Sequence, residues 1–63
     1  MKIEEFYFGQ RVKMFDKDDN CNVYGHVTDI EPDRVCIKWN DIDHAVWHDK
    51  DEFKDIKNGS PTN

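Results

Sequence analysis

The fold is decided by residues 23–41, which read VYGHVTDIEPDRVCIKWND. Apolar and β-branched residues alternate with polar ones on both sides of a Pro-Asp pair, which is the pattern of two strands joined by a tight turn. Pro32 presets the backbone for a turn and cannot donate to a β-ladder, and Asp33 also favours a turn. The stretch therefore predicts a β-hairpin hinged at Pro32.

The two arms of this hairpin differ in regularity. The second arm alternates strictly, so Val35, Ile37 and Trp39 should face one way and the residues between them the other. The first arm does not, because Val27 and Ile30 can both face inward only if a bulge breaks the period between them. Gly25 predicts either a bulge or a close backbone approach.

Length and composition bound the possible functions. A chain of 63 residues makes one domain with a small core, so most large apolar residues should be needed for folding. Eight aromatic residues indicate a folded chain. The net charge of −5 argues against sequence-independent binding to the phosphate backbone of a nucleic acid. Two cysteines cannot build a disulfide framework, and no signal or membrane-spanning segment is evident, so we expect a cytoplasmic protein with free thiols.

The rest of the chain can be added to the hairpin. We expect a first strand over 11–15, a polar loop over 16–22, a turn over 40–43, a fourth strand over 44–48, a helical turn over 49–53 and a short closing strand over 54–57. Phe53 should plug the core, and Phe6 or Phe8 should cover one end of it. The expected organisation is a lead-in over 1–8, a domain over 9–57 and a disordered tail over 58–63.

A helical interpretation of the C-terminal third competes with this one. Ile42, Val46, Phe53 and Ile56 are also spaced as one helical stripe. Against a helix, Asp49 would fall inside that stripe and Trp47 on the opposite face. We therefore favour a strand followed by a helical turn.

The spacing of these elements resembles the SH3-like small barrels, and among them the Tudor and KOW-type modules. The residues that carry the resemblance are Gly9-x-x-Val12, Tyr24-Gly25-x-Val27-x-x-Ile30, Val35-x-Ile37-x-Trp39-x-Asp41 and Asp51-Glu52-Phe53. The resemblance implies an all-β, five-stranded SH3-like barrel over 9–57 with one short helical turn near 49–53. It also implies that ligands are contacted by loops at one end.

Tudor modules hold methylated cations in an aromatic cage, and this chain keeps part of such a cage. By the resemblance, Tyr24 and Trp39 match two walls, while the other two fall on Asp16 and Ile42 and the polar partner falls near His44. KOW-type modules use a basic loop, but the equivalent loop over 16–22 holds three aspartates and one lysine. Direct nucleic-acid binding is therefore disfavoured.

Metal binding and catalysis have little support in the sequence. His44 and His48 have helical ligand spacing, but on a strand they would lie ~13 Å apart, too far to share one ion. The start of a calcium loop at Asp16 lacks the required glycine and the closing glutamate. Cys36 could pair with a histidine as a nucleophile, but it lies in the middle of a strand. We expect no metal, no cofactor and no enzymatic activity.

The leading functional prediction is a non-enzymatic protein-interaction module that binds a basic or cationic partner segment through an aromatic–acidic face. The predicted contact residues are Tyr24, Trp39, Trp47, Asp16, Asp41 and Asp43. If the binding face lies elsewhere on the domain, Phe15 and Phe53 are the next candidates for aromatic contact residues, and we call them the two substitutes. An acidic rim formed by Asp41, Asp43, Asp49, Asp51, Glu52 and Asp55 would attract such a segment if the turns after the third and fourth strands lie close together.

The alternative is a nucleic-acid-associated protein, which either binds RNA or DNA directly or imitates nucleic acid with its acidic surface to occupy a DNA-binding protein. A small chain of this kind also fits an accessory protein of a phage. No contact with a membrane is expected, and the oligomeric state is left open.

Overall fold

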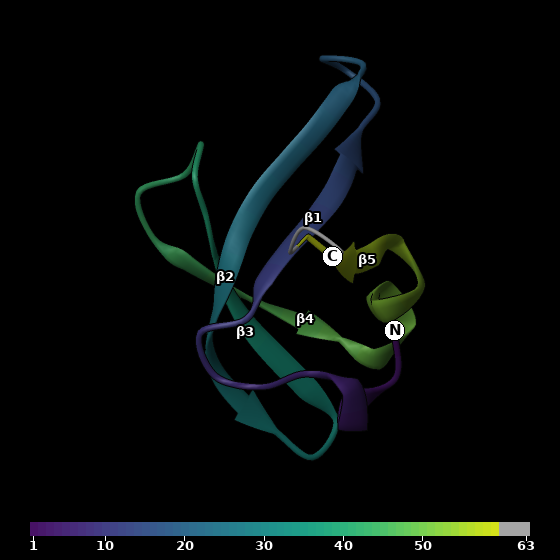
Figure 1. The fold of residues 1–63 in the computed structure, drawn as a ribbon, viewed down its shortest axis with the longest axis vertical. Coiled ribbons are helices and arrows are strands. Elements are labelled where there is room, and N and C mark those ends of the chain that lie inside the picture. Colours follow the sequence, from purple (N-terminus) through teal and green to yellow (C-terminus); the bar gives the residue numbers. More distant parts are fainter. Residues whose placement is uncertain (60–63) are drawn as a thin grey trace.

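The computed structural model describes residues 1–59 of the chain. Its elements are η1 (Ile3–Glu5), β1 (Arg11–Asp16), β2 (Cys21–Glu31), β3 (Arg34–Trp39), β4 (Ala45–Asp49), η2 (Lys50–Asp55) and β5 (Ile56–Asn58), where η denotes a 3-10 helix. The strands form one antiparallel sheet in the order β4-β3-β2-β1-β5 (Figure 1). The prediction of an all-β fold with five strands and one short helical turn before the last strand is confirmed.

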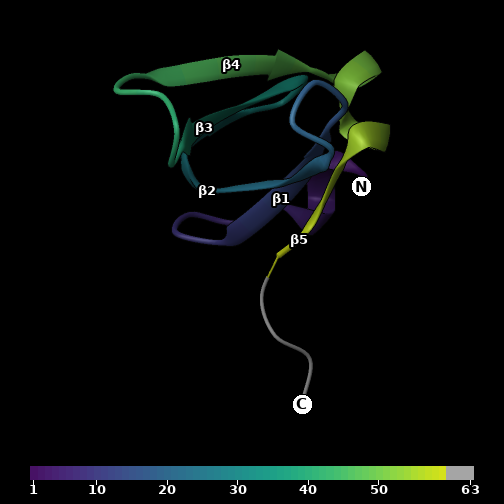
Figure 2. The same cartoon turned by 90° about the horizontal axis from the view of Figure 1, so that it is seen from above.

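The sheet is curled, with β4 and β5 at its two edges. Seen from above, β4 lies across the molecule from β1, and η2 connects the two edge strands (Figure 2). The competing prediction of a helix across the C-terminal third is wrong, because that segment is divided into β4, η2 and β5. The four apolar residues of that stripe belong to different segments: Ile42 precedes β4, Val46 lies in β4, Phe53 in η2 and Ile56 in β5.

The β2–β3 hairpin forms as its sequence predicts. Pro32 and Asp33 make the turn, and Glu31 pairs with Arg34 across it. The register shifts between Val27 and Asp29, which is the bulge needed to turn both Val27 and Ile30 toward the core. Gly25 marks a close backbone approach, since a Cβ atom there would lie 2.6 Å from the Lys38 carbonyl oxygen.

The core lies on the concave face of the sheet. Its buried members are Phe6, Val12, Val27, Val35, Ile37, Trp39, Phe53 and Ile56. Phe53 is the predicted plug and packs edge-to-face on Phe6, with ring centroids 5.0 Å apart. Phe6 therefore covers one end of the core, whereas Phe8 is 66% exposed.

The N-terminal segment is packed against the domain. The Met1 amine donates a hydrogen bond to the Phe53 carbonyl at 2.7 Å. Beside the bulge, the Val27 N–H donates to the Gln10 carbonyl at 3.0 Å and the Gly9 N–H donates to the Val27 carbonyl at 2.9 Å. Through Met1 and Phe6, the segment that precedes β1 thus contacts Phe53 of η2.

At the other terminus, Asn58 closes β5, and the Gly59 N–H donates to the Arg11 carbonyl at 2.8 Å. The predicted disordered tail over 58–63 therefore begins inside an ordered strand. Its last four positions, 60–63, lie outside the described residues.

The third strand is buried on both faces. Val35, Ile37 and Trp39 face the core as predicted, and Cys36 on the outer face is also buried, at 7% exposure. It lies opposite Trp47 of β4 in the register, so that indole helps to cover it. Cys36 and the exposed Cys21 are both free thiols.

Candidate functional site

A groove of about 330 Å³ lies between the β1–β2 turn and the β3–β4 turn. Both turns lie at the end of the molecule opposite the Pro32 turn (Figure 1). The lining residues are Met14, Phe15, Asp16, Lys17, Val23, Trp39, Asp41, Ile42, Val46 and His48. We call this feature the hairpin groove. Apolar side chains make up its floor, and two carboxylates are among its lining groups.

The β1–β2 turn positions Asp16. The Asp16 Oδ1 accepts a hydrogen bond from the Asp18 N–H at 2.9 Å, and Asn20 adopts a left-handed conformation with φ of 53°. Short polar residues tolerate both arrangements, because their side chains hydrogen-bond to the local backbone. The second carboxylate oxygen of Asp16 has no such role in the turn and can accept from a ligand.

The β3–β4 turn positions Asp41. The Asn40 N–H donates to the Tyr24 carbonyl at 2.9 Å, which anchors the turn to β2. The Lys38 ammonium donates to the Trp39 carbonyl at 2.8 Å and to the Ile42 carbonyl. One lysine therefore fixes the backbone on both sides of Asp41.

A hydrogen-bonded chain supports the floor of the groove. The Trp39 Nε1–H donates to His48 Nε2 at 2.9 Å, and His48 Nδ1 lies 3.0 Å from Glu52 Oε2. An indole N–H can only donate, so Nε2 is the accepting nitrogen of a neutral His48 ring and Nδ1–H donates to Glu52. With both ring nitrogens engaged and 5% exposure, His48 has a structural role and offers no free nitrogen for acid–base catalysis.

The structure brings three of the predicted contact residues together. Asp16, Asp41 and Trp39 all line the hairpin groove, although Trp39 is only 2% exposed and presents little ring surface. Of the two substitutes, Phe15 lines the same groove and Phe53 is buried in the core.

The other predicted contact residues lie elsewhere. Asp43 is exposed and faces His44, with Oδ1 and Nδ1 3.2 Å apart. Tyr24 and Trp47 are on the outer face of the sheet, opposite the groove, by their register with Lys13 and Cys36.

An arginine covers each of these outer-face aromatics. The guanidinium carbon of Arg11 lies 4.6 Å from the centroid of the Tyr24 ring, and that of Arg34 lies 4.3 Å from the centroid of the Trp47 ring. The hydrogen bond from Arg34 to Glu31, at 2.6 Å, raises the pKa of Arg34 above its ordinary value. These cation–π contacts occupy ring faces that the sequence prediction assigned to a partner.

The predicted acidic rim is divided by β4. Asp41 and Asp43 precede this strand, whereas Asp49 ends it and the remaining acids lie in η2. A strand of this length separates its ends by roughly 13 Å. Asp41 is the member of the rim that lines the hairpin groove.

Sequence reasoning missed the apolar floor. Met14, Val23 and Val46 line the groove and were assigned only to strands. The available signal was their inward position in each alternating strand. What the alternation could not show is that the core is incomplete at this end, which leaves these side chains half-buried.

Among residues 1–59, no group of three or more His, Cys, Asp and Glu side chains is arranged to hold a metal ion. Nor does this part of the chain form a helix with the length and apolarity needed to cross a membrane. Comparison with protein-family models, curated proteins and solved structures gives no match.

Proposed function

We propose that this chain is a non-enzymatic interaction module of SH3-like barrel architecture, located in the cytoplasm, that binds a basic segment of a partner protein in the hairpin groove. The observation that carries the proposal is the presence of Asp16 and Asp41 in one groove with an apolar floor. A lysine or arginine side chain suits such a site, because its methylene stem packs on apolar surface while its charged head reaches a carboxylate.

The curled sheet supports the architectural part of the proposal. A five-stranded antiparallel sheet whose edge strands are connected by a 3-10 turn has the element order expected of an SH3-like barrel. The position of the groove, between two turns at one end, agrees with the way such barrels contact ligands.

The chemistry of the groove favours an unmodified cation over a methylated one. A methylated ammonium needs open aromatic ring faces, and Trp39 is 2% exposed. Two carboxylates instead favour a group that donates hydrogen bonds, such as a primary ammonium or a guanidinium. The net charge of −5 would also speed the approach of a basic partner.

A ¹⁵N-NMR titration with a nine-residue peptide of lysine, arginine and leucine tests this proposal. We expect shifts at the amides of Asp16 and Asp41 and at the indole N–H of Trp39. Asp16→Asn and Asp41→Asn should each weaken binding about five-fold, which corresponds to ~1 kcal/mol for an exposed ion pair. The asparagine at position 16 keeps an oxygen for the Asp18 N–H, so the turn is retained.

Asp33→Asn is the matched control, because it removes the same charge from the turn at the opposite end and should leave the affinity unchanged. Raising salt from 20 to 200 mM should weaken the wild-type complex about ten-fold. Equal losses for Asp33→Asn and Asp41→Asn, or shifts confined to the Pro32 turn, would contradict binding in the groove.

A further inference from the structure

A second groove, of about 360 Å³, lies on the β5 side of β1. Its lining residues are Lys13, Met14, Phe15, Lys17, Asn22, Lys54, Asp55 and Lys57. We call it the lysine groove. Its four lysines come from four different segments: β1, the β1–β2 turn, η2 and β5. The fold alone collects them, since they are scattered along the sequence.

The lysine groove is a local positive surface on an acidic chain. It holds four of the nine Lys and Arg residues of the chain. Arg11 lies two residues before Lys13 in β1 and therefore on the same face of that strand. Within residues 1–59, the Arg34–Glu31 ion pair and the contacts of His44 with Asp43 and of His48 with Glu52 involve none of these four lysines. Asp55 is the one acidic residue among the lining groups.

The register places two of these cations in direct opposition. Lys13 of β1 pairs with Lys57 of β5 in the antiparallel ladder, so both side chains leave the same face of the sheet. Like charges directly opposite one another destabilise a sheet. An anion bound between the two ammonium groups would relieve that repulsion. The register of β1 and β5 thus favours an anion at this place independently of how many lysines line the groove.

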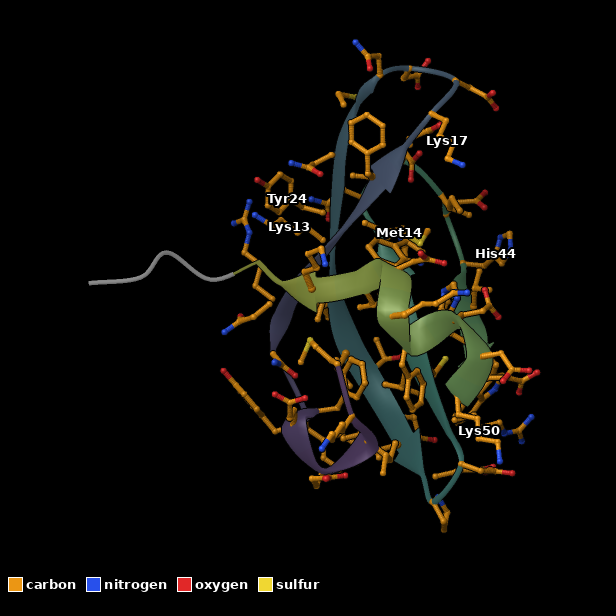
Figure 3. The ribbon with its side chains drawn as sticks, turned by 90° about the vertical axis from the view of Figure 1, so that its right-hand side faces the viewer. Lys13, Met14, Lys17, Tyr24, His44 and Lys50 are labelled. Atoms are coloured by element: carbon orange, nitrogen blue, oxygen red, sulfur yellow. The ribbon has the colours of Figure 1, made fainter. Side chains whose placement is uncertain are left out.

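Aromatic rings alternate with the cations on this face. Tyr24 pairs with Lys13 on the β2 side, and the two side chains lie next to each other in Figure 3, with Lys17 by the β1–β2 turn. Phe15 lies on the same face of β1 as Lys13 and is 53% exposed. Arg11 covers one face of Tyr24, so Phe15 is the more open ring.

We propose that the lysine groove binds single-stranded nucleic acid, with the lysine ammonium groups on successive phosphates and an unstacked base on Phe15. Cationic side chains that follow a backbone beside an exposed aromatic ring are the elements of single-strand recognition. An acidic protein segment would use the lysines but not the ring, and a duplex offers no unstacked base. The two grooves share Met14, Phe15 and Lys17, but Asp16 and Asp41 line only the hairpin groove, whereas Lys13, Lys54 and Lys57 line only the lysine groove. The proposal does not depend on the proposed function.

Fluorescence anisotropy with a labelled twelve-residue oligothymidine at 50 mM salt tests the proposal. Four phosphate contacts predict a slope of log affinity against log salt of about −3, so binding should weaken roughly fifty-fold between 50 and 200 mM salt. Lys57→Glu should weaken binding about ten-fold or more and make the slope shallower by about one. The same substitution should leave the thermal midpoint unchanged or raise it, because it faces Lys13 with an opposite charge.

Lys50→Glu is the matched control, since it makes the same charge change at the start of η2, away from the groove, and should alter affinity less than about two-fold. Phe15→Leu should weaken oligothymidine binding about five-fold or more without changing the salt slope. Three results would overturn the proposal: no binding at 50 mM salt, an equal loss for Lys50→Glu and Lys57→Glu, or polyglutamate competing as well as oligothymidine with Phe15→Leu having no effect.

Discussion

Gly25→Ala is expected to lower the free energy of unfolding by about 3 kcal/mol, the upper end of the range for overpacking. The added Cβ atom would lie 2.6 Å from the Lys38 carbonyl oxygen and 3.0 Å from the Trp39 Cα atom, both of which are backbone atoms of β3. Neither can rotate away, so the β2–β3 ladder must shift. Urea unfolding followed by tryptophan fluorescence measures this loss.

Gly9→Ala is the control for this prediction. Gly9 has φ of +78°, but a Cβ atom there meets nothing within 4 Å. Its cost is the left-handed conformation alone, about 1 kcal/mol. If Gly9→Ala were the more damaging substitution, the close approach of β2 and β3 would not be what requires a glycine at position 25.

The features that the sequence predicted correctly depend on neighbours along the chain. The Pro32 turn, the bulge after Val27 and the glycine at position 25 all belong to one hairpin, whose register is set by its own turn. Phe53 was identified as a plug because it is the large apolar residue in an otherwise charged segment. Such local signals are sufficient for the elements and for much of the core.

The features that the sequence could not predict depend on strands far apart in the chain. The opposition of Lys13 and Lys57 follows from the β1–β5 register, and no local pattern encodes it. The net charge of the chain does not reveal the lysine groove either, because it sums the lysines of that groove with the acidic residues of the turns. The prediction that Trp47 belongs to a binding face was made from alternation, which gives the period of a strand. Alternation does not show that the side chain of Arg34 covers the Trp47 ring.

Trp39→Ala is expected to have the largest effect on stability, a loss of about 3–5 kcal/mol. A domain of this length has roughly 3–9 kcal/mol in total, at 0.05–0.15 kcal/mol per residue. The substitution removes the largest buried side chain of β3 and the donor to His48, and it opens the floor of the hairpin groove into the core. Circular dichroism should show a largely unfolded chain or a thermal midpoint lowered by more than about 12 °C.

A double-mutant cycle separates the hydrogen bond from the packing. Trp39→Phe keeps most of the ring and removes the N–H, whereas His48→Leu leaves the Trp39 N–H buried without an acceptor and should cost about 1–3 kcal/mol. The double variant has neither polar group, so its loss should be smaller than the sum of the two single losses by about 1 kcal/mol. Additive losses would show that the Trp39–His48 contact contributes by packing alone, and the floor of the groove would then not depend on the orientation of the imidazole.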